Sequence, residues 1–230
     1  MSIIVKNTTL ISLFDLLAPH SCRGCGTIGE PLCNRCKNYI ILHNSNFCPI
    51  CKIKTPSGQC QNCKDLPPIF IVGERSGLLD EIIHEYKYSS TKALSFKLAN
   101  LLDSCLPKNL PENTVIVPLP TATNHIRSRG FDHILRLAKQ LANIRHYRVK
   151  RLLIRTSNTT QVGSSRKARL SQADHAFSVD PKFSIDKNLT YILLDDVWTT
   201  GASMKAAIKK LQQAGVSKIV VALLAVSRLD

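Results

Sequence analysis

The sequence of 230 residues contains no apolar run close to the roughly 18 residues that a membrane-spanning helix needs, and its first residues lack the charge and cleavage pattern of a signal peptide. Acidic residues are scarce too: 16 Asp and Glu stand against 31 Lys and Arg, a formal net charge of +15. These absences argue against a membrane span and against secretion, and we expect a cytoplasmic protein. The excess of cations predicts polyanionic partners, namely phosphates, nucleic acid or an acidic membrane surface.

Other features of the composition are ordinary. Apolar residues make up 44% and charged residues 20% of the chain, which is the usage of folded globular proteins and excludes disorder or a fibrous repeat. A chain of this length can form one large domain or a smaller domain with an appendage. Cysteine usage favours the second arrangement, because eight of the nine cysteines lie between residues 22 and 63. We expect an N-terminal region at 1–66 and a second domain at 67–230.

The eight clustered cysteines form four Cys-x-x-Cys pairs, a spacing that places two thiolates on one tight turn. Two tetrahedral sites would use all eight thiolates and leave no open position, so the pairs predict two structural zinc ions. A disulfide framework is the alternative, but thiols stay reduced in a cytosolic chain. Sequential grouping is the simplest, and spacing alone leaves nested or crossed grouping open. The expected ligands are Cys22, Cys25, Cys33, Cys36, Cys48, Cys51, Cys60 and Cys63.

A short apolar segment at residues 11–17 ends before Pro19 and predicts a helix. A membrane anchor is the sharper interpretation, but the segment is short and contains Asp15. We expect this helix to pack against the rest of the protein.

From Pro67 onward, short β-rich runs alternate with segments of helical periodicity. Strands are expected at 69–72, 114–117, 152–154, 191–194 and 218–226, and helices at 78–86, 93–102, 134–144 and 204–213. This alternation predicts an α/β fold whose mostly parallel sheet is covered by helices. Ligands of such sheets bind at the carboxyl ends of the strands.

One strand end carries a group of polar residues suited to a sugar phosphate. The apolar run at 191–194 leads directly to Asp195 and Asp196, and a turn through residues 199–201 then enters a helix. Free N–H groups at a helix start can bind a phosphate, and the carboxylates can accept hydrogen bonds from sugar hydroxyls. The alternative is ordinary helix capping after a common turn.

Residues 191–203 resemble the 5-phosphoribosyl-1-pyrophosphate (PRPP) signature of type I phosphoribosyltransferases. Other segments resemble the successive blocks of the ComF/GntX family, and with the cysteine pairs they cover nearly the whole chain. These segments are Tyr86-Lys87-Tyr88, Val117-Pro-Leu-Pro120, Arg127-Ser-Arg-Gly-Phe-Asp132 and Gln161-Val-Gly with Arg166, Arg169 and Phe177. The chain departs from the family pattern at Asp132, Ser164 and Gln172, which replace Asn, an apolar residue and Asn.

The resemblance implies a double zinc ribbon fused to a phosphoribosyltransferase-like domain, a family associated with DNA uptake in natural transformation. The implied ligand is PRPP with Mg²⁺, and partners in the DNA-uptake machinery, a helicase or a translocation channel, are implied too. The residues implied at PRPP are Leu119, Pro120, Thr121, Asp195, Asp196, Val197, Trp198, Thr199, Thr200, Gly201, Ala202 and Ser203. The residues implied in catalysis are Asp195 and Asp196 at the ribose, with Lys87, Arg127 and Arg129 at the leaving pyrophosphate. An active transferase with an unidentified nitrogen base and a catalytically dead PRPP sensor both remain open.

Residues 126–170 carry twelve Lys and Arg against one acid, Asp132, more charge than one PRPP needs. A solvated basic face is one interpretation; the family's association with DNA favours a single-stranded DNA track, with Phe131, His133, His146 and Tyr147 as stacking groups. The expected contacts are Arg136, Lys139, Arg145, Arg148, Lys150, Arg151, Arg166, Lys167 and Arg169.

Overall fold

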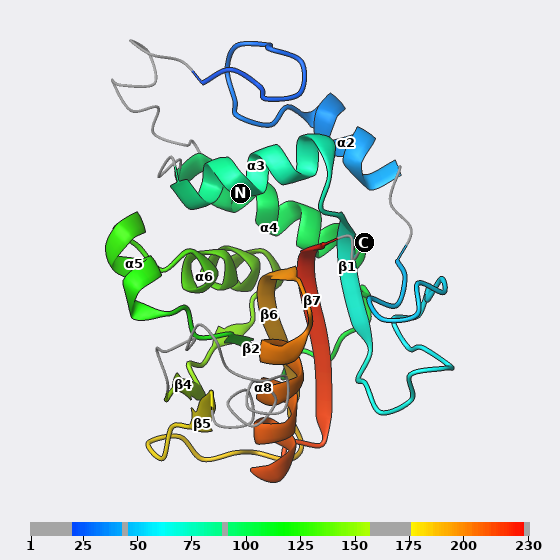
Figure 1. The fold of residues 1–230 in the computed structure, drawn as a ribbon, viewed down its shortest axis with the longest axis vertical. Coiled ribbons are helices and arrows are strands. Elements are labelled where there is room, and N and C mark those ends of the chain that lie inside the picture. Colours follow the sequence, from blue (N-terminus) through cyan, green and yellow to red (C-terminus); the bar gives the residue numbers. More distant parts are fainter. Residues whose placement is uncertain (1–19, 43–45, 89–91, 157–175, 228–230) are drawn as a thin grey trace, which may run out of the picture.

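The protein is described by a computed structural model at residues 20–42, 46–88, 92–156 and 176–227. Its centre is a five-stranded parallel sheet with the strand order β1-β7-β6-β2-β3 (Figure 1). These strands are β1 (Ile69–Glu74), β2 (Val115–Pro118), β3 (Arg148–Val149), β6 (Thr190–Trp198) and β7 (Lys218–Val226). The predicted α/β fold with a mostly parallel sheet is confirmed. The helix predicted at residues 11–17 lies outside the described residues.

Helices and a small hairpin surround this sheet. The helices are α2 (Asn34–Leu42), α3 (Gly77–Tyr88), α4 (Lys92–Cys105), α5 (Thr123–Arg129), α6 (His133–Arg145) and α8 (Ala202–Gln213). The hairpin pairs β4 (Leu153–Arg155) with β5 (Phe177–Val179) in antiparallel fashion. Within the described part of the chain, no helix is both long and apolar enough to cross a bilayer.

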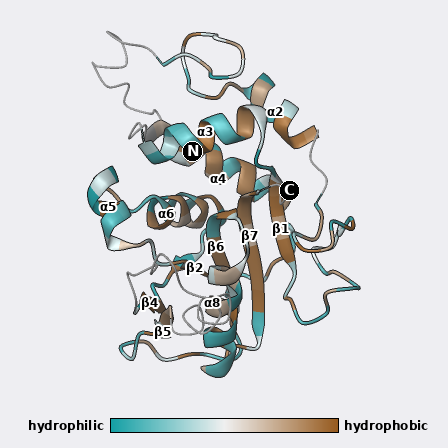
Figure 2. Ribbon diagram, in the orientation of Figure 1, coloured by the Kyte–Doolittle hydropathy of each residue, from teal (hydrophilic) through white to brown (hydrophobic). Residues whose placement is uncertain are grey.

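Alternate side chains of each central strand pack in two separate cores. Ile192 and Leu194 of β6 pack with residues of α3, α4 and α6, whereas Tyr191 and Leu193 pack with α8 and the hairpin. Successive side chains of a strand point to opposite faces, so a strand buried on both faces needs an uninterrupted apolar run. The strands are accordingly the most hydrophobic part of the fold (Figure 2).

The cysteine-rich region shares these cores with the sheet. Leu32 and Ile40, which belong to the first half of that region, are buried with α3 and α4, and Phe47 is buried with Ile69 and Ile71 of β1. Two ion pairs reinforce the first contact: Arg23 pairs with Glu85 of α3, and Glu30 pairs with Lys97 of α4.

Asn46 lies along the outer edge of β1. Its side-chain amide donates to the carbonyl oxygen of Ile69 at 2.9 Å, and its Oδ1 accepts from the backbone N–H of Ile71 at 2.8 Å. The amide thus makes the two hydrogen bonds that a neighbouring strand would make, at a position where β1 has no neighbour in the sheet order.

The expected strands and helices are mostly present, with two instructive differences. The strand expected at 191–194 continues to Trp198, because Asp195, Val197 and Trp198 pair in register with β7. The strand expected at 152–154 is β4, which belongs to the hairpin and not to the main sheet. Helix α5 was not expected, since it buries no residue and its sequence has no apolar periodicity.

Candidate functional site

The carboxyl ends of β2 and β6 lie side by side where the direction of the chain connections reverses. From β2 the chain passes through α6 to β3 on one side, and from β6 it passes through α8 to β7 on the other. The two helices cover opposite faces of the sheet. Such a switch point opens a crevice at the strand ends and is the usual ligand site of open parallel sheets. Asp195 and Asp196 belong to the end of β6.

Asp196 is held by two basic side chains from distant helices. Its Oδ2 lies 2.7 Å from Nζ of Lys87 on α3 and 2.6 Å from Nε2 of His133 on α6. Asp195 makes a different contact: its Oδ1 accepts from the backbone N–H of Asp196 at 2.9 Å, and the charges that favour its ionised form are those of Lys87 and then Arg155. The structure thus brings Lys87, which the family resemblance implies at the pyrophosphate, to the acid pair.

The two carboxyl groups differ in charge. Burial raises the pKa of the Asp195 carboxyl to about 8, and the negative charge of Asp196 adds to the rise. Burial would also raise the pKa of Asp196, but the hydrogen bond with His133 and the Lys87 ammonium prevail and hold it well below its usual range. Near neutral pH the pair therefore carries one negative charge, on Asp196.

The loop between β6 and α8 presents backbone N–H groups. No N–H of Thr199, Thr200 or Gly201 donates a hydrogen bond to another backbone group of the described residues. The N–H of Ala202 meets only the Thr200 hydroxyl, at 3.4 Å. Ser203, in the first turn of α8, has no intrahelical acceptor available. The loop therefore retains free donors at a helix N-terminus.

Trp198 packs its buried side chain against this loop at Gly201. Its side chain is only 2% exposed, and its carbonyl accepts from the N–H of Ser227. Gly201 has a φ of +76°, and a Cβ there would lie 2.2 Å from Cζ2 of the indole. Glycine is required at this position for both reasons. Val197 and Trp198, which the resemblance implies at PRPP, are the last two residues of β6.

The turn after β2 has fewer free backbone N–H donors than the sequence suggests. The N–H of Leu119 already donates to the carbonyl of Leu194 at 2.9 Å, and Pro120 has no N–H. The Thr121 hydroxyl donates to Asp132, which also caps α6 by accepting from the N–H of Leu135. Of the three residues expected at PRPP in this turn, Thr121 is the one whose N–H makes no backbone hydrogen bond within the described chain.

The two arginines expected at the pyrophosphate are placed differently. Arg129 lies with Nη1 3.0 and 3.1 Å from the two ring nitrogens of His133, and its buried Nε has no hydrogen-bond partner. Arg127 is exposed on α5 and has neither a hydrogen bond nor an ion pair with either carboxylate. Thus Arg129, through His133, is connected to the acid pair, and Arg127 is not.

Sequence reasoning missed His133 and Arg155 at the acid pair. His133 was expected as an exposed stacking group for nucleic acid, and that expectation is wrong because the side chain is buried. The Tyr86 hydroxyl donates to the carbonyl of His133 at 2.7 Å and so fixes the start of α6 against α3. No local pattern could reveal a pairing between residues 63 positions apart.

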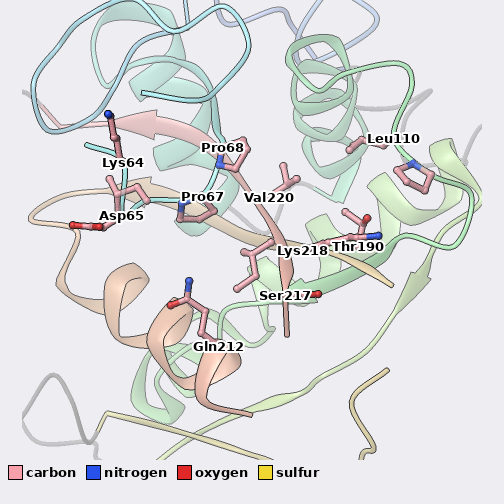
Figure 3. A pocket seen from close by; sticks show the side chains of 13 residues that line it. Lys64, Asp65, Pro67, Pro68, Leu110, Thr190, Gln212, Ser217, Lys218 and Val220 are labelled. Atoms are coloured by element: carbon pink, nitrogen blue, oxygen red, sulfur yellow. The ribbon is translucent and has the colours of Figure 1, made fainter. Parts of the chain in front are cut away.

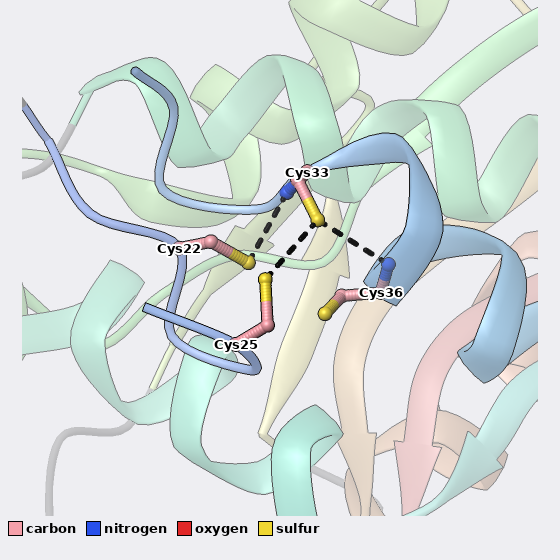
Figure 4. Close-up of side chains that lie close together, drawn as sticks. All are labelled: Cys22, Cys25, Cys33 and Cys36. Atoms are coloured by element: carbon pink, nitrogen blue, oxygen red, sulfur yellow. Dashed lines mark hydrogen bonds between the residues drawn. The ribbon is translucent and has the colours of Figure 1, made fainter. Parts of the chain in front are cut away.

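The cysteines form two groups of four in sequential order, which answers the grouping left open by their spacing. One group is Cys22, Cys25, Cys33 and Cys36, and the other is Cys48, Cys51, Cys60 and Cys63. Within each group all Sγ atoms lie within 4.8 Å of one another. Figure 4 shows the sulfurs of the first group converging from a loop and from α2. Tetrahedral zinc with bonds of about 2.3 Å separates its sulfurs by about 3.8 Å, so both groups fit such an ion.

Chains with similar sequences are competence proteins. This chain is 23% identical to competence protein ComFC of Bacillus subtilis over 198 residues, covering 81% of this chain and 80% of that one. It is 27% identical to competence protein F of Haemophilus influenzae over 228 residues, covering 91% and 96%. For ComFC of Streptococcus pneumoniae the identity is 23%, with coverage of 82% and 84%. No family model matches the chain.

Similarity to these three proteins over most of the chain supports the ComF family. The match to the Haemophilus protein covers 91% of this chain. It therefore includes at least part of the cysteine-rich region as well as the sheet. The resemblance read from the short sequence blocks is confirmed by this nearly full-length similarity.

The cationic side chains of the basic segment fall into two groups: some are packed within the fold, and others are exposed. Arg145 is packed within the fold: its side chain is 8% exposed, pairs with Asp103, and donates to the carbonyls of Pro107 and Leu106 after α4. It therefore ties α6 to α4 and is not part of an exposed basic surface. Arg136 stacks on Phe131 at 4.0 Å, and Lys150 is half-buried. Of the residues expected at DNA, Lys139, Arg148 and Arg151 are exposed, and Arg166, Lys167 and Arg169 lie outside the described residues.

A cavity of about 490 Å³ opens at the other end of the sheet (Figure 3). Its lining includes Lys64 and Pro67 from the cysteine-rich side and Thr190 and Lys218 at the amino ends of β6 and β7. None of the residues expected at PRPP, at zinc or at DNA lines it. The cavity thus lies at the amino ends of the strands, whereas ligands of parallel sheets usually bind at the carboxyl ends.

Proposed function

We propose that this ComF protein binds PRPP, with Mg²⁺, at the carboxyl ends of β2 and β6. The observation that carries the proposal is the pair Asp195 and Asp196 beside a loop of free N–H groups at the switch point of the sheet. A diol can donate to paired carboxyl groups, and a phosphate can accept from free amides at a helix start. Both requirements of a ribose phosphate meet at one strand end.

Each part of the ligand has a suitable group in the described chain. The amides of residues 199–203 would hold the 5-phosphate, and the acid pair would hold the ribose hydroxyls. Oδ2 of Asp196 is occupied by Lys87 and His133, which leaves Oδ1 as the acceptor. Arg129 has a buried Nε without a partner, and an anion is the chemistry that would satisfy it.

The magnesium ion would come with the substrate. Mg²⁺ takes few protein carboxylates and keeps waters or substrate oxygens, and it would neutralise charge on the pyrophosphate. Only one carboxylate of the pair is ionised, which suits an ion held mainly by the ligand. Lys87 has two competing roles, because it must leave Asp196 to reach a pyrophosphate.

The test is a calorimetric titration of PRPP in Mg²⁺ with the wild type and with the double variant Asp195→Asn, Asp196→Asn. We expect the variant to lose PRPP binding by at least about tenfold, since a neutral amide oxygen replaces the ionised acceptor of the diol. Its circular dichroism spectrum and its zinc content should match those of the wild type. Unchanged affinity in a folded double variant would contradict the proposal.

We also propose that the protein handles single-stranded DNA during DNA uptake, together with a helicase or translocation channel of the uptake machinery. The relatives are competence proteins by name, the chain carries a net charge of +15, and Lys139, Arg148 and Arg151 are exposed on the basic segment. Affinity for oligothymidylate should fall steeply with salt, because bound cations release counterions. Replacing Arg148 and Arg151 by Ser should weaken binding and reduce the salt slope, whereas a flat salt response would refute the proposal.

Measuring the release of pyrophosphate distinguishes two further possibilities: transfer to a nitrogen base, and PRPP sensing without transfer. An active transferase releases pyrophosphate when PRPP and its acceptor base are both present. A sensor binds PRPP and releases none with any base.

A further inference from the structure

Tyr88 is an exposed aromatic residue at the end of the helix that supplies Lys87. Its ring is 61% exposed, although the two residues before it are tightly held. Tyr86 is buried with its hydroxyl on the carbonyl of His133, and the Lys87 ammonium lies on Asp196. The contacts of Tyr86 and Lys87 thus hold the end of α3 in place, while Tyr88 is open to solvent.

A cationic plane continues this aromatic surface toward the acid pair. The Arg129 guanidinium lies 5.3 Å from the centroid of the Tyr88 ring, and its Nη1 is 3.0 Å from Nδ1 of His133. His133 in turn holds Asp196. On the other side, His84 lies one helical turn before Tyr88 with its ring centroid 4.7 Å away. Flat groups therefore run in contact from the surface of α3 to Asp196.

The chemistry of this surface selects a flat, polar ring system. Aromatic faces and guanidinium planes both stack on nucleobases, with little dependence on the identity of the base. An aliphatic partner would have to cover a guanidinium that has no carboxylate partner among the described residues, which costs free energy. A nucleobase can stack on the tyrosine ring and on the plane of the guanidinium without such a cost.

We infer that Tyr88, together with Arg129, is a stacking site for a nucleobase next to the sugar-phosphate site. The inference rests on the proposed PRPP site, and it gives that site a place for the base at C1 of the ribose. The base can be free, as the acceptor of a transfer, or part of a single DNA strand. Both sources share the same stacking chemistry, and separate binding measurements distinguish them.

The experiment compares Tyr88→Ala and Tyr88→Phe with the matched control Tyr39→Ala, which removes a similarly exposed tyrosine (58%) from α2. One arm measures fluorescein-labelled oligothymidylate by anisotropy without PRPP. The other arm measures free adenine, guanine, cytosine and uracil by equilibrium dialysis with PRPP and Mg²⁺. We expect Tyr88→Ala to weaken at least one probe by about 5- to 100-fold, the loss typical of one stacked base. Tyr88→Phe keeps the ring and should stay within about twofold of the wild type.

The outcomes separate this inference from the proposed function. A titration of PRPP alone should be the same in Tyr88→Ala and the wild type, since Tyr88 has no place at the phosphate or the diol. If PRPP does not bind the wild type, the proposed function fails, but the strand arm still tests Tyr88. The inference is overturned if no probe binds the wild type, if Tyr88→Ala binds every probe normally, or if Tyr39→Ala loses as much as Tyr88→Ala.

Discussion

At the scale of single residues, the main feature is that two adjacent carboxyl groups have opposite protonation tendencies. Asp196 is ionised because Lys87 and His133 hold it, and Asp195 is kept neutral by burial and by the charge of Asp196. Two ionised carboxylates at this distance would repel each other in a poorly solvated place. The pair can thus accept and donate hydrogen bonds at the same time, which suits a sugar with two neighbouring hydroxyls.

The charge of Asp195 makes a prediction for stability. Its pKa in the folded chain, about 8, exceeds the value of about 3.9 in an unfolded chain. Its contribution is therefore fully present below pH 4 and is lost as the pH rises through 8. Asp195→Asn cannot ionise, so from pH 5 to pH 9 the variant should gain on the order of 1–3 kcal/mol relative to the wild type. Urea unfolding at both pH values measures this, and exposed Asp65→Asn is the control. An equal pH dependence of wild type and variant would contradict it.

Gly201 makes a second prediction at this scale. Gly201→Ala adds a Cβ that meets the Trp198 indole in a left-handed backbone conformation. Gly130 is a matched control, because it has the same φ of +76° and no atom within 4 Å of an added Cβ. We expect Gly130→Ala to cost about 1 kcal/mol and Gly201→Ala at least about 2 kcal/mol more. Denaturant unfolding gives both values; equal losses would mean that the loop relaxes away from the indole.

Residues next to each other in the sequence were the predictable part of the site. The acid pair, the glycine turn and the free amides follow from one strand-to-helix segment, whose apolar run must end where solvent begins. The partners of the acids could not be predicted this way, because Lys87 and His133 come from α3 and α6 and meet Asp196 only through the tertiary fold. Lys87 was expected near the site from the family resemblance, and His133 was assigned to the wrong surface.

At the scale of secondary-structure elements, α3 links the first cysteine group to the acid pair. Arg23 lies inside the first Cys-x-x-Cys turn, and its guanidinium pairs in bidentate fashion with Glu85. Two residues further along α3, Lys87 reaches Asp196. The backbone of Gly24 also packs closely against Cys36 and Leu78, at the other end of the helix. The first Cys-x-x-Cys turn, which belongs to a cysteine group that could hold a metal ion, thus contacts both ends of the helix that supplies Lys87.

Loss of the metal from the first group should therefore be felt at Asp196. Cys25→Ser should reduce the zinc content, increase deuterium uptake in the last turn of α3, and weaken PRPP binding by about 5- to 150-fold, since coupling between sites is typically about 1–3 kcal/mol. The control is Cys63→Ser, which affects the second group and leaves the contact of Arg23 with Glu85 intact. If both variants change α3 equally, the link through Arg23 is refuted.

At the scale of the whole molecule, the boundary between the cysteine-rich region and the sheet is less distinct than the change in composition suggests. We expected units at 1–66 and 67–230, and this division stays a prediction. The buried residues nevertheless form cores that run across it, since Leu32 packs with α3 and α4 and Phe47 packs with β1. Composition detects where cysteines cluster, but it cannot detect which apolar side chains are shared.

Continuous cores predict a single unfolding transition. We expect zinc release, far-ultraviolet ellipticity and the emission of Trp198, the single tryptophan of the chain, to change together as denaturant is increased. Trp198 lies at the carboxyl end of the sheet, so its emission reports on a region remote in sequence from the cysteines. Release of zinc well before the change in emission would instead indicate two independently folding units.

The parallel sheet itself was the most predictable feature of the molecule, because buried strands require apolar runs and helices require apolar stripes. The strand order was not predictable from those runs. It depends on the covering helices. It makes β2 and β6 neighbours at the switch point, although α5, α6, β3 and the hairpin separate them in the sequence. The family resemblance implied a site at the ends of the strands expected at 114–117 and 191–194, but the apolar runs alone could not show that these two strands are neighbours.

The amide of Asn46 has a consequence for how copies of this protein behave in a crowded solution. A free strand at the border of a sheet invites a foreign chain to dock and is a common start of aggregation. Here a foreign strand would first have to displace the Asn46 side chain, which already forms hydrogen bonds with the carbonyl of Ile69 and the N–H of Ile71. At the opposite border β3 is only two residues long and offers almost no template. The cysteine-rich region, through Asn46, therefore opposes the addition of a sixth strand next to β1.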